Sequence, residues 1–198
     1  MKLSFERTTI VVGAIALALV VGAVLVIGRQ LMTEGDSSKP TSDKETAAAT
    51  QRLLGRPSLE DAEAQLRSAV EQIAAAGTDL IPGMQWSWNR ERTPSGCDKP
   101  YDRTDGRIVY LQEYVSNTPV PDNVWQAFAE RAHAIAAQVG ATTPETMQNA
   151  PGNHDVWFFN PEDGTTIKIG SQVATVISGT VGCHLPASRL TPPTRPTS

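Results

Sequence analysis

The first pattern along the chain is an unbroken apolar block near the N-terminus. Residues 10–27 read IVVGAIALALVVGAVLVI and contain neither a charge nor a proline. An α-helix of this length rises about 27 Å, which is close to the thickness of a bilayer core. Because Lys2 and Arg7 precede the block, the positive-inside rule places residues 1–9 in the cytoplasm. The pattern predicts a single-pass signal anchor over residues 10–28, with the rest of the chain outside the cell membrane.

A cleaved signal peptide is the competing interpretation of this block. Such peptides have an apolar region of about 7–15 residues, followed by a cleavage site of the small-x-small type. The block is longer, and the sequence VLVIGRQLMTEG offers no convincing site. No cysteine lies near the block, so lipidation at a lipobox is excluded. We therefore expect the anchor to stay in place.

Two polar segments flank the region in which helix and strand patterns occur. Residues 33–57 read TEGDSSKPTSDKETAAATQRLLGRP, and residues 191–198 read TPPTRPTS. Such segments bury too little apolar surface to offset the entropy of ordering them. We expect a disordered linker over residues 29–56, in which KETAAATQRLLG could form a transient helix, and a disordered Pro-rich tail over residues 191–198. The folded extracytoplasmic domain then covers residues 57–190.

Two helices of similar design are predicted inside this domain. The segment PSLEDAEAQLRSAVEQIAAAG has apolar residues at helical spacing, with a cap at Ser58 and a stop at Gly77. The segment PDNVWQAFAERAHAIAAQVG repeats the pattern and ends at Gly140.

Alternating apolar and polar residues predict strands around these helices. The segments are MQWSWNR (84–90), RIVYLQEYVS (107–116), HDVWFFN (154–160), TTIKIGSQ (165–172) and VATVISGTVGCHL (173–185). The order α-β-β-α-β-β-β is typical of an α+β fold. We expect a two-layer α/β sandwich with a mainly antiparallel sheet and both helices on one face.

Charge narrows the choice of partners. The chain of 198 residues has a formal net charge of −4, and residues 8–198 contain 15 basic and 20 acidic residues. A mildly acidic domain lacks the clustered positive charge with which nucleic-acid-binding proteins attract phosphate. We expect no nucleic-acid partner.

The two cysteines, Cys97 and Cys183, are the only ones in the chain. Export places both in an oxidising compartment, where an even pair favours a disulfide. Closing this loop is worth about 4.6 kcal/mol in the chain-entropy model, less any strain. Two other interpretations are less favoured. A zinc site could use His133, His154 or His184 but lacks paired ligand spacing, and a catalytic cysteine lacks a local signature.

Other chemistry has little support in the sequence. Dinucleotide, P-loop, nucleophile-elbow and zinc-protease motifs are all missing from it, so we expect no enzyme, no cofactor and no metal. The tryptophans Trp86, Trp88, Trp125 and Trp157 could line a ligand pocket. Core packing is the commoner fate of such residues in a small domain.

Several short motifs occur together in the folded domain. The most specific are Ile81-Pro82-Gly83 leading into Trp86, Cys97, the turn Gly140-Ala141-Thr142, and Gly182-Cys183. Over residues 57–186 this combination resembles the LppA-like lipoprotein family of mycobacteria and related actinobacteria. The resemblance implies a cell-envelope protein of undefined biochemical role, displayed outside the cytoplasmic membrane, and supplies no catalytic residue. The chain departs from the family in having an apolar helix where members typically carry a lipobox cysteine.

Three functions are consistent with these patterns. The first is a binding or interaction module of the cell envelope, which predicts a filled core and an exposed apolar or aromatic patch. The second is a carrier of an apolar, lipid-like envelope ligand, which predicts an aromatic cavity of at least about 300 Å³. The third is an envelope enzyme without a recognisable motif, which predicts converging histidines and carboxylates.

Overall fold

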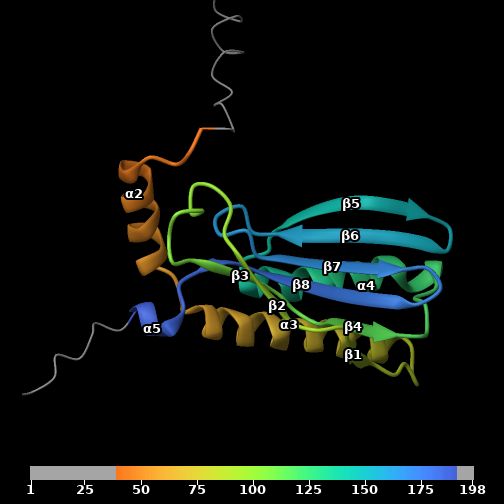
Figure 1. Cartoon of the computed structure of the whole chain (residues 1–198). Helices are drawn as coiled ribbons and strands as arrows, with labels where there is room; N and C mark the ends of the chain where they lie inside the picture. The colour runs from red at the N-terminus through yellow and green to blue at the C-terminus, as the bar shows by residue number, and fades with distance from the viewer. Residues whose placement is uncertain (1–38, 191–198) are drawn as a thin grey trace, which may run out of the picture. The chain divides into compact units, whose positions relative to one another are not determined.

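The computed structural model describes residues 39–190 (Figure 1). The predicted cytoplasmic segment (1–9), transmembrane helix (10–28) and tail (191–198) lie outside these residues. Within residues 39–190 no helix is long and apolar enough to cross a membrane. The transmembrane helix in the predicted fold class is thus not supported by the described residues, and only the α+β part of that prediction is carried forward.

Helix α2 (Asp43–Leu54) lies in a segment for which the sequence predicted disorder. It begins at a capping box, in which the Ser42 hydroxyl accepts from the Glu45 amide while the Glu45 carboxylate accepts from the Ser42 amide. Leu53 near its end is fully buried. The prediction of a disordered linker over residues 29–56 was thus wrong for this helix, which is held by contacts with distant parts of the chain.

The two predicted long helices are present as α3 (Leu59–Leu80) and α4 (Asp122–Ala136). The short helices η1 (Ala137–Val139) and α5 (Ala187–Leu190) follow α4 and the last strand. Helix α3 continues past its predicted end at Gly77. A Cβ atom at Gly77 would lie 3.2 Å from the side chains of both Trp86 and Phe128. This glycine therefore permits close packing inside a helix and does not end it.

The eight strands within residues 39–190 form one sheet, and every pairing within it is antiparallel. The main path has the order β1-β4-β8-β7-β6-β5, and β2 joins through β3, which pairs with β8. The strands are β1 (Ser87–Asn89), β2 (Thr93–Gly96), β3 (Arg107–Tyr110), β4 (Glu113–Ser116), β5 (Thr143–Ala150), β6 (Asn153–Phe159), β7 (Thr166–Ser171) and β8 (Thr175–His184).

The predicted element order was wrong in two respects. The segment 107–116 forms two strands, β3 and β4, which pair with different parts of β8. Strands β2 and β5 were not predicted at all, because their side chains are almost entirely exposed and lack an apolar alternation. The sheet therefore has more strands than the predicted α-β-β-α-β-β-β order contains.

Helices α3 and α4 pack on the same face of this sheet, as predicted (Figure 1). The core lies between them and the sheet, and its fully buried residues include Phe128, Phe158, Ile167, Ile169 and Ile177. Figure 1 shows α4 behind β6–β8 and no helix in front of these strands. The two-layer arrangement thus leaves one face of the sheet uncovered by the described elements.

Candidate functional site

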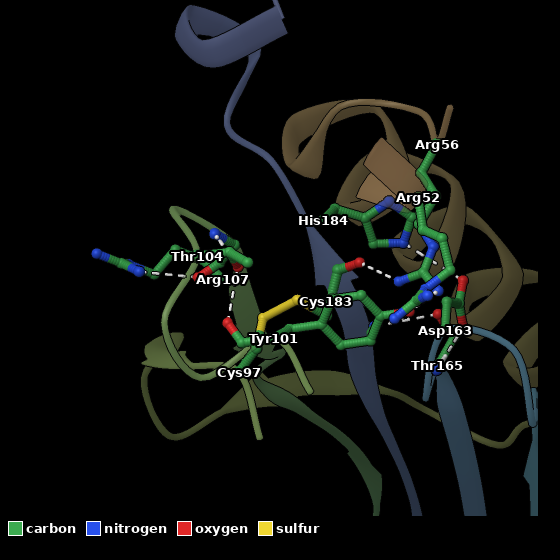
Figure 2. Close-up of a disulfide and its surroundings, with 12 residues drawn as sticks. Arg52, Arg56, Cys97, Tyr101, Thr104, Arg107, Asp163, Thr165, Cys183 and His184 are labelled. Carbon is green, nitrogen blue, oxygen red and sulfur yellow. Dashed lines mark hydrogen bonds and ion pairs between the residues drawn. A yellow bond between two sulfur atoms is a disulfide. The ribbon is translucent and has the colours of Figure 1, made fainter. Parts of the chain in front are cut away.

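The disulfide between Cys97 and Cys183 is confirmed, with a Cα–Cα distance of 5.7 Å (Figure 2). It ties the residue after β2 to the C-terminal part of β8. Both cysteines are buried, and together with Leu53 and Leu185 they form a small second core. The two thiols are therefore unavailable as a nucleophile or as zinc ligands, which overturns both alternative interpretations of the cysteines.

An arginine and a tyrosine join α2 to this second core (Figure 2). Arg56 donates to the Cys183 carbonyl at 2.7 Å, to the Tyr101 hydroxyl at 3.0 Å and to the Glu162 carbonyl at 2.5 Å. Its guanidinium carbon also lies 4.9 Å from the centre of the Tyr101 ring. Two of these three hydrogen bonds join residues that are more than a hundred positions apart in the sequence. They fix the end of α2 against β8 and indicate a structural role.

Beside the disulfide, His184 and Asp163 form a buried pair (Figure 2). The Nδ1 atom of His184 lies 3.0 Å from the Pro57 carbonyl, and its Nε2 lies 3.3 Å from Asp163 Oδ2, within ion-pair distance but not aligned as a hydrogen bond. Burial alone would raise the pKa of Asp163. The His184 ring and hydrogen bonds from Thr165 outweigh it and hold that pKa below its usual value. His184 is buried, whereas Asp163 borders a surface hollow of about 480 Å³ together with Tyr101 and Glu162.

The predicted pocket-lining tryptophans do not converge on one site. Trp86 and Trp88 both stack on Tyr114, with ring centres 5.6 and 4.4 Å away. The indole N–H of Trp86 donates to the Thr78 hydroxyl, and the Arg67 guanidinium lies over the Trp88 ring at 4.0 Å. These two rings cover the margin of the core beside α3. Packing is therefore their role, and neither lines a described groove.

Trp125 and Trp157 lie on opposite faces of the sheet. Trp125 on α4 is buried and stacks on His154, with ring centres 4.5 Å apart and planes 10° apart. Trp157 on β6 points to the uncovered face, where Lys168 Nζ lies 3.6 Å from its ring centre. Each lines a different surface hollow. Two of the four predicted residues thus belong to candidate sites, but to separate ones.

The first candidate site is the open sheet face, which we define by the outward-pointing residues of β6–β8. Along these strands buried and half-buried residues alternate, so that Trp157, Lys168 and Ser178 lie side by side in one row across the sheet. Next to this row Gly170 leaves a hollow of about 400 Å³, bordered by the β7–β8 turn. Val173 in that turn is 84% exposed. The face thus combines an aromatic ring, a cation and a recess.

The second candidate site is the α4 groove, of about 450 Å³, between α4 and strands β5 and β6. At one end His154 Nε2 lies 2.9 Å from Asp122 Oδ1, and Nδ1 lies 2.9 Å from Asn149 Oδ1. Asp122 also accepts from the Gly152 amide at 2.7 Å. The hydrogen bonds from Gly152 and His154 lower the pKa of Asp122. They join the start of α4 to the β5–β6 turn and fix this end of the groove.

Sequence reasoning missed most residues of both sites. Alternation in HDVWFFN and TTIKIGSQ could have placed Trp157 and Lys168 on one face, but their pairing depends on a strand register that the sequence does not state. The histidines were considered as zinc ligands or as parts of an enzyme site, and not as residues that line a groove. His184 lies beside the disulfide, whereas His133 and His154 line the α4 groove. Among residues 39–190 no group of three His, Cys, Asp or Glu side chains is placed to hold a metal ion.

The chain is similar to a known family and to two solved structures. The sequence model of the LppA family, described as a lipoprotein confined to pathogenic Mycobacterium, matches residues 34–187. The crystal structure of LppA from Mycobacterium tuberculosis has a TM-score of 0.62 and 19% identity, covering 84% of this chain and 95% of that one. A DUF4853 family protein from Actinomyces odontolyticus has a TM-score of 0.45 and 14% identity, covering 69% and 72%. No curated protein matches significantly. The first structural likeness shows the fold alone.

Proposed function

This chain belongs to the LppA family, and from that premise we propose that it is an interaction module that binds a protein partner through the open sheet face. The family is described as a lipoprotein, which indicates association with the cell envelope. The partner is then another envelope protein. The proposal assigns the chain no catalytic step and no cofactor, in line with the sequence-based expectation that it is not an enzyme.

The observation that carries this proposal is the uncovered face of a sheet whose other face is covered by α3 and α4. A solvent-facing sheet surface is ordinarily polar, and this one carries Asp155, Lys168 and Ser178. Trp157 and Val176 also lie on it, together with the hollow beside Gly170. Trp is enriched among the residues that dominate binding energy at protein interfaces. A side chain of the partner that enters the hollow would contact both the indole ring and the β7–β8 turn.

Charge supports a partner that offers a carboxylate at this face. Lys168 has no carboxylate partner within residues 39–190, and its ammonium group lies against the Trp157 ring. The Trp157 indole N–H donates to Asp155 Oδ1 at 2.9 Å, which orients the ring. A partner carboxylate could therefore reach Lys168 while an adjacent apolar side chain occupies the hollow.

Filling the hollow tests the proposal. A Cβ atom at Gly170 would meet only the His154 carbonyl oxygen, at an ordinary 3.7 Å. Gly170→Val should therefore leave the fold intact and occlude the hollow, whereas Thr166→Val changes an outward position of the same strand that does not line it. A photo-crosslinking amino acid at the exposed Val173 should capture a protein in intact cells. Gly170→Val should reduce the crosslink at least tenfold, and Thr166→Val should not.

Two results would count against the proposal. A crosslinked protein whose yield is the same with and without Gly170→Val would show that the hollow does not contribute to binding. A crosslink to a non-protein envelope polymer would assign the face to a different class of partner. Circular dichroism of both variants distinguishes loss of binding from loss of fold.

A further inference from the structure

We infer that the α4 groove is a second binding site, which takes a short extended peptide with an apolar residue and a basic residue two positions away on each side of it. The groove lies on the helix-covered side of the sheet, opposite the open sheet face, so the inference is independent of the proposed function. Its walls come from one face of α4 and from β5 and β6. The residues that α4 contributes are Asp122, Trp125, Gln126, Ala129, Glu130 and His133.

The dimensions of the groove fit an extended segment of about five residues. The lining residues of α4 span Asp122 to His133, which is about 16 Å of helix at 1.5 Å per residue. An extended chain covers that length in about five residues at 3.3 Å each. The groove also borders β5, the terminal strand of the sheet path. A groove between a helix and an edge strand is suited to β-augmentation, in which a peptide adds to the sheet edge.

The edge strand itself favours a short occupant over a second copy of the sheet. Strand β5 contains Pro144, which has no amide hydrogen to donate. Its register with β6 shifts between Thr146 and Gln148, which places a bulge at Met147. Proline and bulges are devices by which edge strands avoid long pairing with other sheets. A continuous strand-to-strand dimer along β5 is therefore disfavoured, whereas a peptide can pair with one part of the edge.

The charges of the groove favour a basic occupant. Asp122 and Glu130 are exposed at its rim, and no Lys or Arg is among the described residues that line it. The Glu130 carboxylate accepts a hydrogen bond from the Gln126 side-chain amide at 3.0 Å. A fatty acid or a phospholipid would bring a negative head group to these carboxylates. A lysine or arginine side chain would instead find a counter-charge there.

The middle of the groove is apolar and open because α4 has a small residue there. Ala129 lies between Trp125 and His133 along the helix, and the His133 ring stacks on Phe158 with centres 5.3 Å apart. An apolar peptide side chain can therefore rest on Ala129 between two aromatic walls. Basic residues two positions away on either side of it point to the same face of an extended peptide, and would then reach Asp122 and Glu130. This pattern defines the peptide used in the test.

The test uses the full chain and two acetylated, amidated pentapeptides with an N-terminal fluorophore. One has the sequence KTVTK and the other has the acidic sequence ETVTE. Fluorescence anisotropy should show binding of KTVTK, with ETVTE at least tenfold weaker. Ala129→Phe fills the groove and should weaken KTVTK binding at least tenfold. Ala127→Phe makes the same change at an exposed position of α4 that does not line the groove, and it should leave binding within twofold.

A second variant keeps the inference testable if Ala129→Phe fails to fold. Glu130→Gln keeps the size of an exposed side chain and should weaken KTVTK binding about threefold, an effect that vanishes in 0.5 M salt. Equal binding of the two peptides, or binding that Ala129→Phe does not change, would overturn the inference. So would a groove that binds dodecanoate in preference to KTVTK. Binding of KTVTK only after deletion of residues 191–198 would identify the chain's own tail as the occupant and would also overturn it.

Discussion

Removing the disulfide should cost this domain a large share of its stability. The bridge joins residues 86 apart in sequence. In the chain-entropy model, a loop of that length restricts the unfolded chain by about 4.6 kcal/mol at 25 °C. Domains of this size typically have a free energy of unfolding of about 5–15 kcal/mol. The double variant Cys97→Ala, Cys183→Ala should therefore fold only marginally, and its Tm should fall by about 9–18 °C.

Urea unfolding of the full chain, followed by tryptophan fluorescence, measures this loss directly. If the double variant loses less than about 1 kcal/mol of unfolding free energy, the loop-closure reasoning is refuted.

A substitution at Gly106 provides a second test of the disulfide. A Cβ atom there would lie 2.6 Å from Cys183 Sγ and 3.0 Å from Cys97 Sγ. Gly106→Ala should thus be costly with the disulfide present and much less so in the double variant. Equal costs in both backgrounds would mean that the sulfur atoms are not what excludes a side chain.

Three further substitutions test other parts of the fold. Gly182→Ala should lower the free energy of unfolding by about 2–3 kcal/mol, because its Cβ would meet the Asp163 carbonyl and lie 2.8 Å from the Thr165 amide nitrogen. Gly96→Ala, with nothing within 4 Å, is its control in the same thermal melts, and equal melting temperatures would contradict the packing argument. Leu53→Ala should lower the free energy of unfolding by about 2–5 kcal/mol and expose α2 to protease. Leu54→Ala, at a position 46% exposed, should do neither. Protection of α2 in both variants would show that Leu53 does not hold the helix against the domain. Asp163→Asn should lower stability at pH 7. Since the folded-state pKa of Asp163 is depressed, the stability it contributes is present above about pH 4 and is lost as pH falls through the folded pKa. The difference between wild type and variant in urea titrations should thus shrink as the pH falls below about 4, and a constant difference would argue against the depressed pKa.

The elements that the sequence predicted well are those whose burial has a local period. Helices α3 and α4 have apolar stripes, and β6–β8 alternate residue by residue. Helix α2 has no such stripe, and its docking depends on Leu53 and on Arg56, which bonds to residues more than a hundred positions away. Composition alone therefore predicts disorder for a segment that folds through distant contacts.

Strand breaks were missed for a related reason. The segment 107–116 alternates as a single strand would, yet the structure buries Val109 and Leu111 and then Ser116. The alternation changes face between β3 and β4, where the Leu111 amide donates to the Gly179 carbonyl outside either strand. Two separate pairings with β8 require this bend. Pairing partners of that kind lie 59–77 residues away, so no local pattern reveals them.

The candidate sites were harder still, because each depends on strand register and on small residues. The pairing of Trp157 with Lys168 comes from the register of β6 with β7, and the hollow beside them comes from the missing side chain of Gly170. In the same way the α4 groove depends on Ala129 and on an edge strand with almost no buried side chains. A search for reactive or metal-binding residue types does not detect sites made by absent side chains.

Strand β6 connects the two proposed sites and also keeps them separate. Its even positions His154, Val156 and Phe158 face α4, and its odd positions Asp155 and Trp157 face the open sheet face. Because successive side chains of a strand point to opposite faces, a substitution on one side leaves the other surface chemically unchanged. Gly170→Val and Ala129→Phe therefore perturb different sites across the same sheet. A loss of both binding activities in either single variant would indicate damage to the shared sheet, whereas selective losses would support two surfaces that can be occupied at the same time.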